Sequence, residues 1–246
     1  MAHAPGILAA LDLGNHRVLA LIAELDGDKR IVIRGVGIAP SQGIRCGQVV
    51  QLKPLVSSLR AAIEEAELMA KIPVERVYAS VAGVFASGRS TRAAVSLGAR
   101  EREVSMRDLE ALHDALRRQP LPPGHAVLNV VTPTYALDDQ DGILDPQGIV
   151  ARQAAIDAYV MVCQESAVRT VEKAINEAGM EVDEFLFSPI AASLGVLTAD
   201  ERRLGAILID IGYGSTSYAA FANDRLLAAG CFPIGSNKIN DDLVHR

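Results

Sequence analysis

The sequence GAILIDIGYGSTSYAAFANDRLLAAGCFPIG, residues 205–235, decides the fold that we expect for this chain. It contains three apolar runs of strand length, separated by a glycine-rich turn and by an Asn-Asp turn. The first run ends in Asp210, and the Asn-Asp turn is Asn223-Asp224. The stretch therefore predicts an antiparallel β-meander whose first strand ends in an acidic residue.

The turn that follows Asp210 has the composition of a phosphate-binding loop. Gly212 and Gly214 leave room for a ligand to approach the backbone, and they permit positive φ. Backbone amides and the hydroxyls of Ser215 and Thr216 can surround phosphate oxygens. A carboxylate at the end of a buried strand needs compensation, which Mg²⁺ carried by phosphates would supply. On turn chemistry alone, an ordinary hairpin explains the stretch equally well.

Two common nucleotide-binding motifs are excluded for this stretch. It lacks the third glycine of the dinucleotide fingerprint, and the next segment of the chain is strand-like rather than helical. The chain contains no Gly-Lys-Ser/Thr sequence, so it has no P-loop. A phosphate site built on this turn would therefore belong to a different class of fold.

A second copy of the unit lies near the start of the chain. Residues 7–38 contain an apolar run that ends in Asp12, a glycine-bearing turn, a second run, an acidic turn and a third run. Asp12 lies 14 residues before Asp26, and Asp210 lies 14 residues before Asp224. Two hairpins with the same internal spacing predict a duplicated fold in which the two turns face one ligand.

Composition limits the classes of protein. The 246 residues suffice for two or three small structural units. A net charge of −6 and the absence of a basic tail argue against a nucleic-acid partner. The start of the chain lacks the positive segment of a signal peptide, and no run approaches the ~20 apolar residues of a membrane helix. Cys46, Cys163 and Cys231 have no metal-ligand spacing, so we expect reduced thiols in or near the core.

The pattern between the two copies predicts helices, strands and one inserted unit. Over residues 84–158 the spacing changes, and we expect a small α+β insert. There, Asp138, Asp139 and Asp141 accompany a glycine, which favours a solvated turn over a metal site. Helices with one apolar face are predicted over 54–71, from the Ser105 capping box to about 118, and over 164–178. A helix of small residues is predicted from 188 onward, and a final helix from 235 onward. Strands are predicted over 77–81, 126–131, 151–162 and 182–187.

Two such strand–Asp–Gly-turn units resemble the actin/Hsp70/sugar-kinase superfamily. The passages SQGIRCGQVVQL (41–52), VLNVVTPTYALDDQDGILDPQG (127–148) and SPIAASLGVLTADERRLGAILIDIGYGST (188–216) narrow the resemblance to the FtsA family of bacterial actin-like cell-division proteins. The resemblance implies an α/β, actin-like (ribonuclease H-like) core that carries an inserted SHS2-type domain. It divides the chain into the first core domain (1–83), the insert (84–158), the completion of the first core domain (159–204) and an incomplete second core domain (205–246).

The resemblance also implies a ligand and a role for each turn. ATP with Mg²⁺ would lie between the turns, with Asp12 and Asp210 near the metal ion. The residues implied to face the phosphates are Gly14, Asn15, His16, Gly212, Tyr213, Gly214, Ser215 and Thr216. Asn15-His16 stands where a Ser or Thr is often found, and Tyr218 where an acid often recurs, so we expect weak ATP hydrolysis or none and no catalytic residue. We also expect weak nucleotide affinity, because the adenosine contacts of the family lie in regions not present here.

By the same resemblance, the protein would polymerise and link the tubulin-like ring protein FtsZ to the cytoplasmic face of the inner membrane at the division site. The insert would bind other division proteins, and the membrane would be reached through a C-terminal helix that is absent from this sequence. Two alternatives stay open. One is another actin-like assembly protein of the PilM type. The other is a sugar-kinase or chaperone-type ATPase, which would need a catalytic acid or a substrate pocket between the repeats.

Overall fold

The computed structural model describes residues 6–28 and 30–239. Its first sheet has the strand order β13-β6-β1-β2-β3, with β1 and β6 parallel and the three strands β1 to β3 forming the predicted first meander. Alternate side chains of these strands are buried, as expected for strands with one covered face. The strands of this sheet are β1 (Ile7–Leu13), β2 (Arg17–Leu25), β3 (Ile31–Pro40), β6 (Arg76–Val81) and β13 (Glu181–Phe187).

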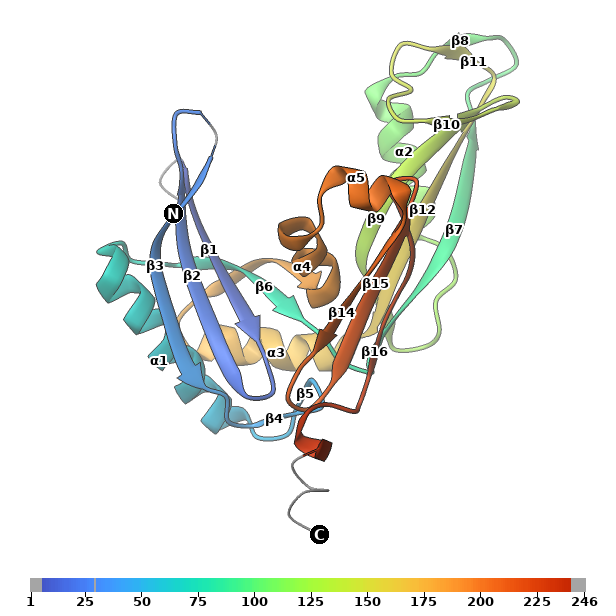
Figure 1. Ribbon diagram of the computed structural model, residues 1–246. Coiled ribbons are helices and arrows are strands. Elements are labelled where there is room, and N and C mark those ends of the chain that lie inside the picture. The colour runs from blue at the N-terminus through green and yellow to red at the C-terminus, as the bar shows by residue number, and fades with distance from the viewer. Residues whose placement is uncertain (1–5, 29, 240–246) are drawn as a thin grey trace.

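Two helices cover one face of this sheet (Figure 1). These are α1 (Leu52–Ala70) and α3 (Glu165–Glu177), both at predicted positions. Glycines let α1 approach β3 closely, since a Cβ atom on Gly37 would collide with the carbonyl oxygen of Ala62. The segment before α1 forms a short hairpin of β4 (Ile44–Arg45) and β5 (Gln48–Val49).

The insert is a separate α+β unit with its own core, at the upper right in Figure 1. Its main sheet has the order β10-β9-β12-β7, and α2 packs against β7 and β12. Strand β7 was not predicted, because its sequence ASGRSTRAAVS is mostly polar and lacks a regular alternation. The insert contains β7 (Ala86–Ser96), β8 (Arg102–Glu103), α2 (Met106–Arg117), β9 (His125–Leu137), β10 (Gln140–Ile143), β11 (Val150–Ala151) and β12 (Gln153–Gln164).

The second meander forms as predicted, with the strand order β14-β15-β16. Helix α4 lies between it and the first sheet, and α5 connects α4 to β14. None of the helices within the described residues is long and apolar enough to cross a membrane. The helix predicted from 235 onward lies largely outside the described residues. The elements are α4 (Ser188–Val196), α5 (Ala199–Leu204), β14 (Ala206–Ile211), β15 (Thr216–Ala222) and β16 (Arg225–Phe232).

The start of α2 is held by a capping box and by an arginine–aspartate pair. The Asp108 carboxylate accepts a hydrogen bond from each terminal nitrogen of Arg102, both at 2.7 Å, and one from the backbone amide of Ser105 at 2.9 Å. The hydrogen bonds from Arg102 and then from Ser105 hold the pKa of Asp108 well below its usual range. A carboxylate with a depressed pKa stabilises the fold above its unfolded pKa, and that contribution is lost as the pH falls.

We expect Asp108→Asn to lower the free energy of unfolding at pH 7 by about 1 kcal/mol, because the amide replaces an ionised helix cap. The difference from the wild type should shrink below about pH 4, where the unfolded-state carboxyl begins to protonate. Urea denaturation across this pH range measures it. Asp114→Asn, in the exposed pair with Arg118 on the same helix, is the control and should change little. A difference that stayed constant with pH would contradict this assignment.

Candidate functional site

The two strand–turn–strand units have the same backbone geometry. Asp12 pairs with Leu19 across the first hairpin, and Asp210 pairs with Ser217 across the second, at the same distance along the chain. Within each turn the first glycine donates its amide to the residue three positions later. The Gly14 amide lies 3.1 Å from the Arg17 carbonyl oxygen, and that of Gly212 lies 2.9 Å from the Ser215 carbonyl oxygen. The two units, which we inferred to be duplicates from their spacing, therefore also share their pattern of backbone hydrogen bonds.

The turn glycines are needed for space, not for positive φ. Positive φ, which glycine permits, occurs at other glycines of the chain but not at Gly14, Gly212 or Gly214. A Cβ atom on Gly14 would lie 2.8 Å from the Arg17 carbonyl oxygen, and one on Gly214 would lie 3.0 Å from Cγ of Asn15. The amides of Gly14 and Gly212 are bonded inside their turns. A phosphate would therefore be met chiefly by side chains and by other amides.

The two turns touch each other directly. The Asn15 side-chain amide donates a 3.0 Å hydrogen bond to the Ser215 hydroxyl. The rings of His16 and Tyr213 lie side by side, with centroids 5.2 Å apart and planes tilted by 36°. Asn15 also accepts a 2.9 Å hydrogen bond from the amide of Gly47, at the tip of the β4–β5 hairpin. One asparagine thus joins three segments that are far apart in the sequence.

The carboxylates of the two strand ends share one cleft. Asp12 and Asp210 both line a cavity of about 380 Å³ between the turns, and both also line an adjoining, more apolar cavity of about 340 Å³ beside α4. The Ser80 hydroxyl of β6 donates to Asp12. Partial burial, and then repulsion by the Asp12 carboxylate, raise the pKa of Asp210. An acid with a raised pKa lowers stability at neutral pH, which is typical of a functional site.

Most of the site residues predicted from the sequence line the larger cavity. Asp12, Asp210, Gly14, Asn15, His16, Gly212, Tyr213 and Ser215 do so. Gly214 packs on Asn15 instead. The Thr216 hydroxyl donates to the Ile234 carbonyl oxygen at 2.7 Å, so it is engaged by the segment after β16. The roles proposed for these residues stay predictions.

Four serines at the cleft were missed by sequence analysis. Ser188, Ser217 and Ser236 line the larger cavity, and Ser80 holds Asp12. Ser188 comes directly after β13, and Ser80 pairs with Asp12 across β1 and β6. Ser80 could have been found from the sequence, because it lies near the end of a predicted strand that would run parallel to the strand ending at Asp12. The other three depend on how the units pack, which single-sequence patterns do not reveal.

The cysteines are free thiols, as predicted. Cys163 is buried, whereas Cys46 and Cys231 are half-buried. Burial raises the pKa of both Cys163 and Cys231. They therefore stay protonated and unreactive at neutral pH.

Within the described residues, no group of three or more His, Cys, Asp or Glu side chains could hold a metal ion. In the turn predicted at Asp138, the Asp138 carboxylate accepts hydrogen bonds from the backbone amides of Arg152 and Gln153. Asp12 and Asp210 fit a hard cation that is also held by phosphate oxygens and water, because such an ion needs few protein ligands. The repulsion between the two carboxylates is what a divalent cation would relieve.

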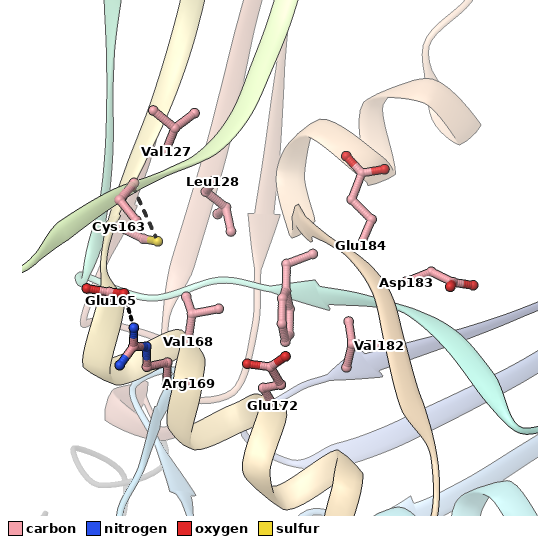
Figure 2. A pocket seen from close by; sticks show the side chains of 12 residues that line it. Val127, Leu128, Cys163, Glu165, Val168, Arg169, Glu172, Val182, Asp183 and Glu184 are labelled. Carbon is pink, nitrogen blue, oxygen red and sulfur yellow. Dashed lines mark hydrogen bonds and ion pairs between the residues drawn. The ribbon is translucent and has the colours of Figure 1, made fainter. Parts of the chain in front are cut away.

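A third cavity, apart from the two at the cleft, lies where the insert joins the first core unit (Figure 2). Its volume is about 340 Å³, and its lining combines apolar and acidic side chains from β9, α3 and β13. Val127 and Val168 contribute apolar surface, while Glu172 and Glu184 extend from α3 and β13 around it. Arg169 is engaged by Glu165 one helical turn earlier. The cavity therefore presents an apolar surface with an excess of negative charge.

Comparison with known proteins points to one family. A model of the SHS2 domain inserted in FtsA matches residues 86–162. The chain is 30% identical over 238 residues to the cell division protein FtsA of Pseudomonas aeruginosa, covering 97% of this chain and 57% of that protein. It is 32% identical over 236 residues to FtsA of Neisseria meningitidis serogroup B, covering 96% and 56%. The chain thus spans little more than half the length of these curated relatives.

Solved structures share the fold at low sequence identity. The PilM–PilN type IV pilus biogenesis complex matches with a TM-score of 0.64 at 17% identity, over 97% of this chain and 65% of that chain. The ethanolamine utilization protein EutJ from Carboxydothermus hydrogenoformans matches with a TM-score of 0.54 at 12% identity, over 98% and 57%. The predicted actin-like α/β fold with an inserted SHS2 domain is confirmed. The boundaries 84–158 that we gave to the insert stay a prediction.

We expect Gly14→Ala and Gly212→Ala to lower the free energy of unfolding by about 1–3 kcal/mol each, because the new Cβ would crowd a backbone carbonyl that cannot move aside. The matched control is Gly27→Ala in the turn between β2 and β3, where nothing lies within 4 Å of the added Cβ. That variant should be neutral or slightly more stable. Guanidinium denaturation measures all three, and equal effects at positions 14 and 27 would contradict the close-approach explanation.

Proposed function

The chain is related to the FtsA cell-division proteins, and on this premise we propose that it is a cell-division scaffold of the FtsA type. Such a scaffold binds ATP, assembles with copies of itself and links the FtsZ ring to the inner membrane. The observation that carries the proposal is the shared cleft, in which Asp12 and Asp210 line one cavity between two equivalent turns.

The cleft supports ATP with Mg²⁺ as the ligand. Bound there, Mg²⁺ would neutralise phosphate charge and the paired carboxylates together. The Asn15 amide and the Ser215 hydroxyl, which already meet across the cleft, supply donors on opposite sides of a polyphosphate chain. His16 and Tyr213 cover the same opening with their rings. Binding would require the Asn15–Ser215 contact to open or to rearrange around the phosphates.

Slow hydrolysis, or none, is the accompanying proposal. Tyr218 stands where related folds often carry a second acid, and its ring stacks on Phe232 with centroids 5.5 Å apart. It therefore packs within the second meander and offers no carboxylate to position a water molecule. The nucleotide then serves as an assembly switch whose occupancy matters more than its turnover.

We propose that the insert binds other division proteins through the cavity of Figure 2. Its apolar lining suits a short apolar segment, and its surplus of carboxylates selects one that carries basic residues. Self-association, FtsZ binding and the position at the cytoplasmic face of the membrane rest on the relationship to FtsA.

A pilus-assembly role of the PilM type is the second candidate, supported by the fold match alone. A sugar-kinase or chaperone-type ATPase is the third. The third candidate would need a further catalytic acid. Among the described residues that line the two cavities, Asp12 and Asp210 are the acidic ones, which favours the scaffold.

In the context of the complete protein, which contains the adenosine contacts, we expect Mg²⁺-dependent binding of ATP. Asp12→Asn and Asp210→Asn should each weaken this binding about tenfold or more, equivalent to about 1.4 kcal/mol each. The reason is that each change removes one of the two charges facing the metal ion. Calorimetry with and without EDTA measures this effect, and inorganic tripolyphosphate should compete. Asp224→Asn, at the far end of the second hairpin, is the control. An ATP affinity that did not depend on Mg²⁺ and was unchanged by the two cleft substitutions would contradict the proposed site.

The division role makes a separate prediction about partners. We expect the chain, in the context of the complete protein, to sediment with FtsZ filaments and to do so differently with ATP and without nucleotide. A PilM-type protein would not sediment with them. Complete absence from the FtsZ pellet under every nucleotide condition would favour the pilus-type alternative, while leaving the nucleotide site to be judged by calorimetry.

A further inference from the structure

Two strands that flank the cleft lie at the edges of their sheets. Strand β13 is an edge of the first sheet, and β16 is an edge of the second meander. Edge strands present backbone amides and carbonyls without a neighbouring strand to bond them, and proteins usually cover such edges. Here the insert packs against both of them.

Asn129 of β9 covers the edge of β13. Its side chain is 8% exposed, and its carboxamide makes two hydrogen bonds with the strand. Nδ2 donates to the carbonyl oxygen of Phe185 at 2.8 Å, and Oδ1 accepts the amide of Phe187 at 3.0 Å. One side-chain amide thus takes the place of a backbone peptide group of an additional strand.

Thr132 and Tyr159 cover the edge of β16. The Leu226 amide donates to the Thr132 hydroxyl at 3.1 Å, and the Ala229 amide donates to the Tyr159 hydroxyl, also at 3.1 Å. Tyr159 is 6% exposed and packs on Gly88 of the neighbouring strand, where a Cβ atom would collide with its ring. The ring of Tyr159 is therefore held in place by its packing against Gly88 of β7.

The three side chains come from an irregular stretch of the insert sheet, in which the register between β9 and β12 shifts twice. Tyr159 pairs with Val131, and the register between β9 and β12 shifts directly after this pair. Thr132 lies in the shift with a φ of +47°, which a β-branched residue rarely adopts, and Pro133 follows it. Both features disfavour this conformation, so the surrounding contacts must hold it in place. We call Asn129, Thr132 and Tyr159 the edge-capping node.

Each strand that the node holds leads directly into the cleft. Phe187 is followed by Ser188, which lines the cavity between the turns. Ala229 lies two residues before Cys231, and Cys231 pairs with Ser217, another residue of that cavity. The node therefore fixes one wall of the cleft on the side of the first core unit and the opposite wall on the side of the second.

We propose that the edge-capping node is a positioning element that sets the separation of the two cleft walls, so that the insert and the cleft are coupled. The node acts through backbone position and does not contact the ligand. Because coupling between two sites is reciprocal, whatever displaces the node changes the cleft, and filling the cleft changes the node. The coupling of the node to nucleotide binding rests on the proposed function. The coupling of the node to the position of the cleft turns does not.

Amide hydrogen exchange of the 246-residue chain tests the node residue by residue. Thr132→Val keeps the shape of the side chain and removes the acceptor, so exchange at the Leu226 amide should rise about tenfold while Ala229 changes little. Tyr159→Phe should do the reverse. Thr132→Ser, which keeps the hydroxyl, should restore protection at Leu226. The matched control is Thr134→Val, the same change two residues further along β9, where the strand pairs with Asp157.

The exchange rates of amides at the cleft test the coupling, because a node that only stabilised the insert would leave them unchanged. The amides of Gly212 and Ser236 are bonded inside the second turn region, to the carbonyl oxygens of Ser215 and Gly212 respectively. In the double variant Thr132→Val/Tyr159→Phe we expect both to exchange several-fold faster. Faster exchange at Leu226 and Ala229 with unchanged cleft amides would overturn the coupling. Unchanged exchange at Leu226 in Thr132→Val would overturn the node itself. If the double variant does not fold, the two single variants carry the same comparison.

Titration with Mg²⁺-ATP separates this inference from the proposed function. Slower exchange at Leu226 and Ala229 when nucleotide is bound, together with an altered affinity in the double variant, would support the full coupling. Bound nucleotide that left both amides unchanged would overturn the part that concerns nucleotide. We expect weak nucleotide affinity in this chain, so the proposed function fails only if the complete protein binds no nucleotide. In either case the exchange at Gly212 and Ser236 in the 246-residue chain decides whether the node positions the cleft.

Discussion

Two carboxylates of like charge, at the ends of two equivalent strands, share one cleft. This arrangement is unfavourable by itself: burial first, and then repulsion by Asp12, raise the pKa of Asp210. The surrounding structure brings the strand ends together nevertheless. The Asn15–Ser215 hydrogen bond joins the turns, and α4 packs against strands of both sheets. Two like charges held in one cavity support the ligand that we propose, because a polyphosphate carrying a divalent cation has the charge distribution that would cancel them.

The duplicated units were predictable because their signal is local. Apolar runs of strand length, an acidic strand end and a glycine turn recur with the same spacing, and the structure shows the same register and the same turn hydrogen bond in both copies. The helices α1 and α3 follow from their apolar periodicity, and the capping box at Ser105 marked the start of α2. Each of these features depends on residues that are close together in the sequence.

The features that escaped prediction depend on contacts between distant segments. Strand β7 is mostly polar, and it becomes a strand because β12 pairs with it along its length. Ser188 and Ser236 reach the cleft only through the packing of the units around them. Thr216 looked like a phosphate ligand from its position in the turn, yet the segment after β16 takes its hydroxyl. The turn glycines do not use the positive φ that glycine permits. Close contacts explain their presence, within each turn at Gly14 and Gly212 and between the turns at Gly214.

Three kinds of contact hold the second meander in place, and they differ in how easily they can change. The packing of α4 against its face buries apolar surface and resists small displacements. The Asn15–Ser215 contact lies at the cleft, where a ligand competes with it directly. The edge-capping node uses single hydrogen bonds to a sheet edge and includes a residue with an unfavourable backbone conformation. Bonds of this kind contribute little net stability but fix geometry closely. The insert is therefore attached where a modest energy can shift the meander relative to the first sheet, which is what a domain that communicates with the cleft requires.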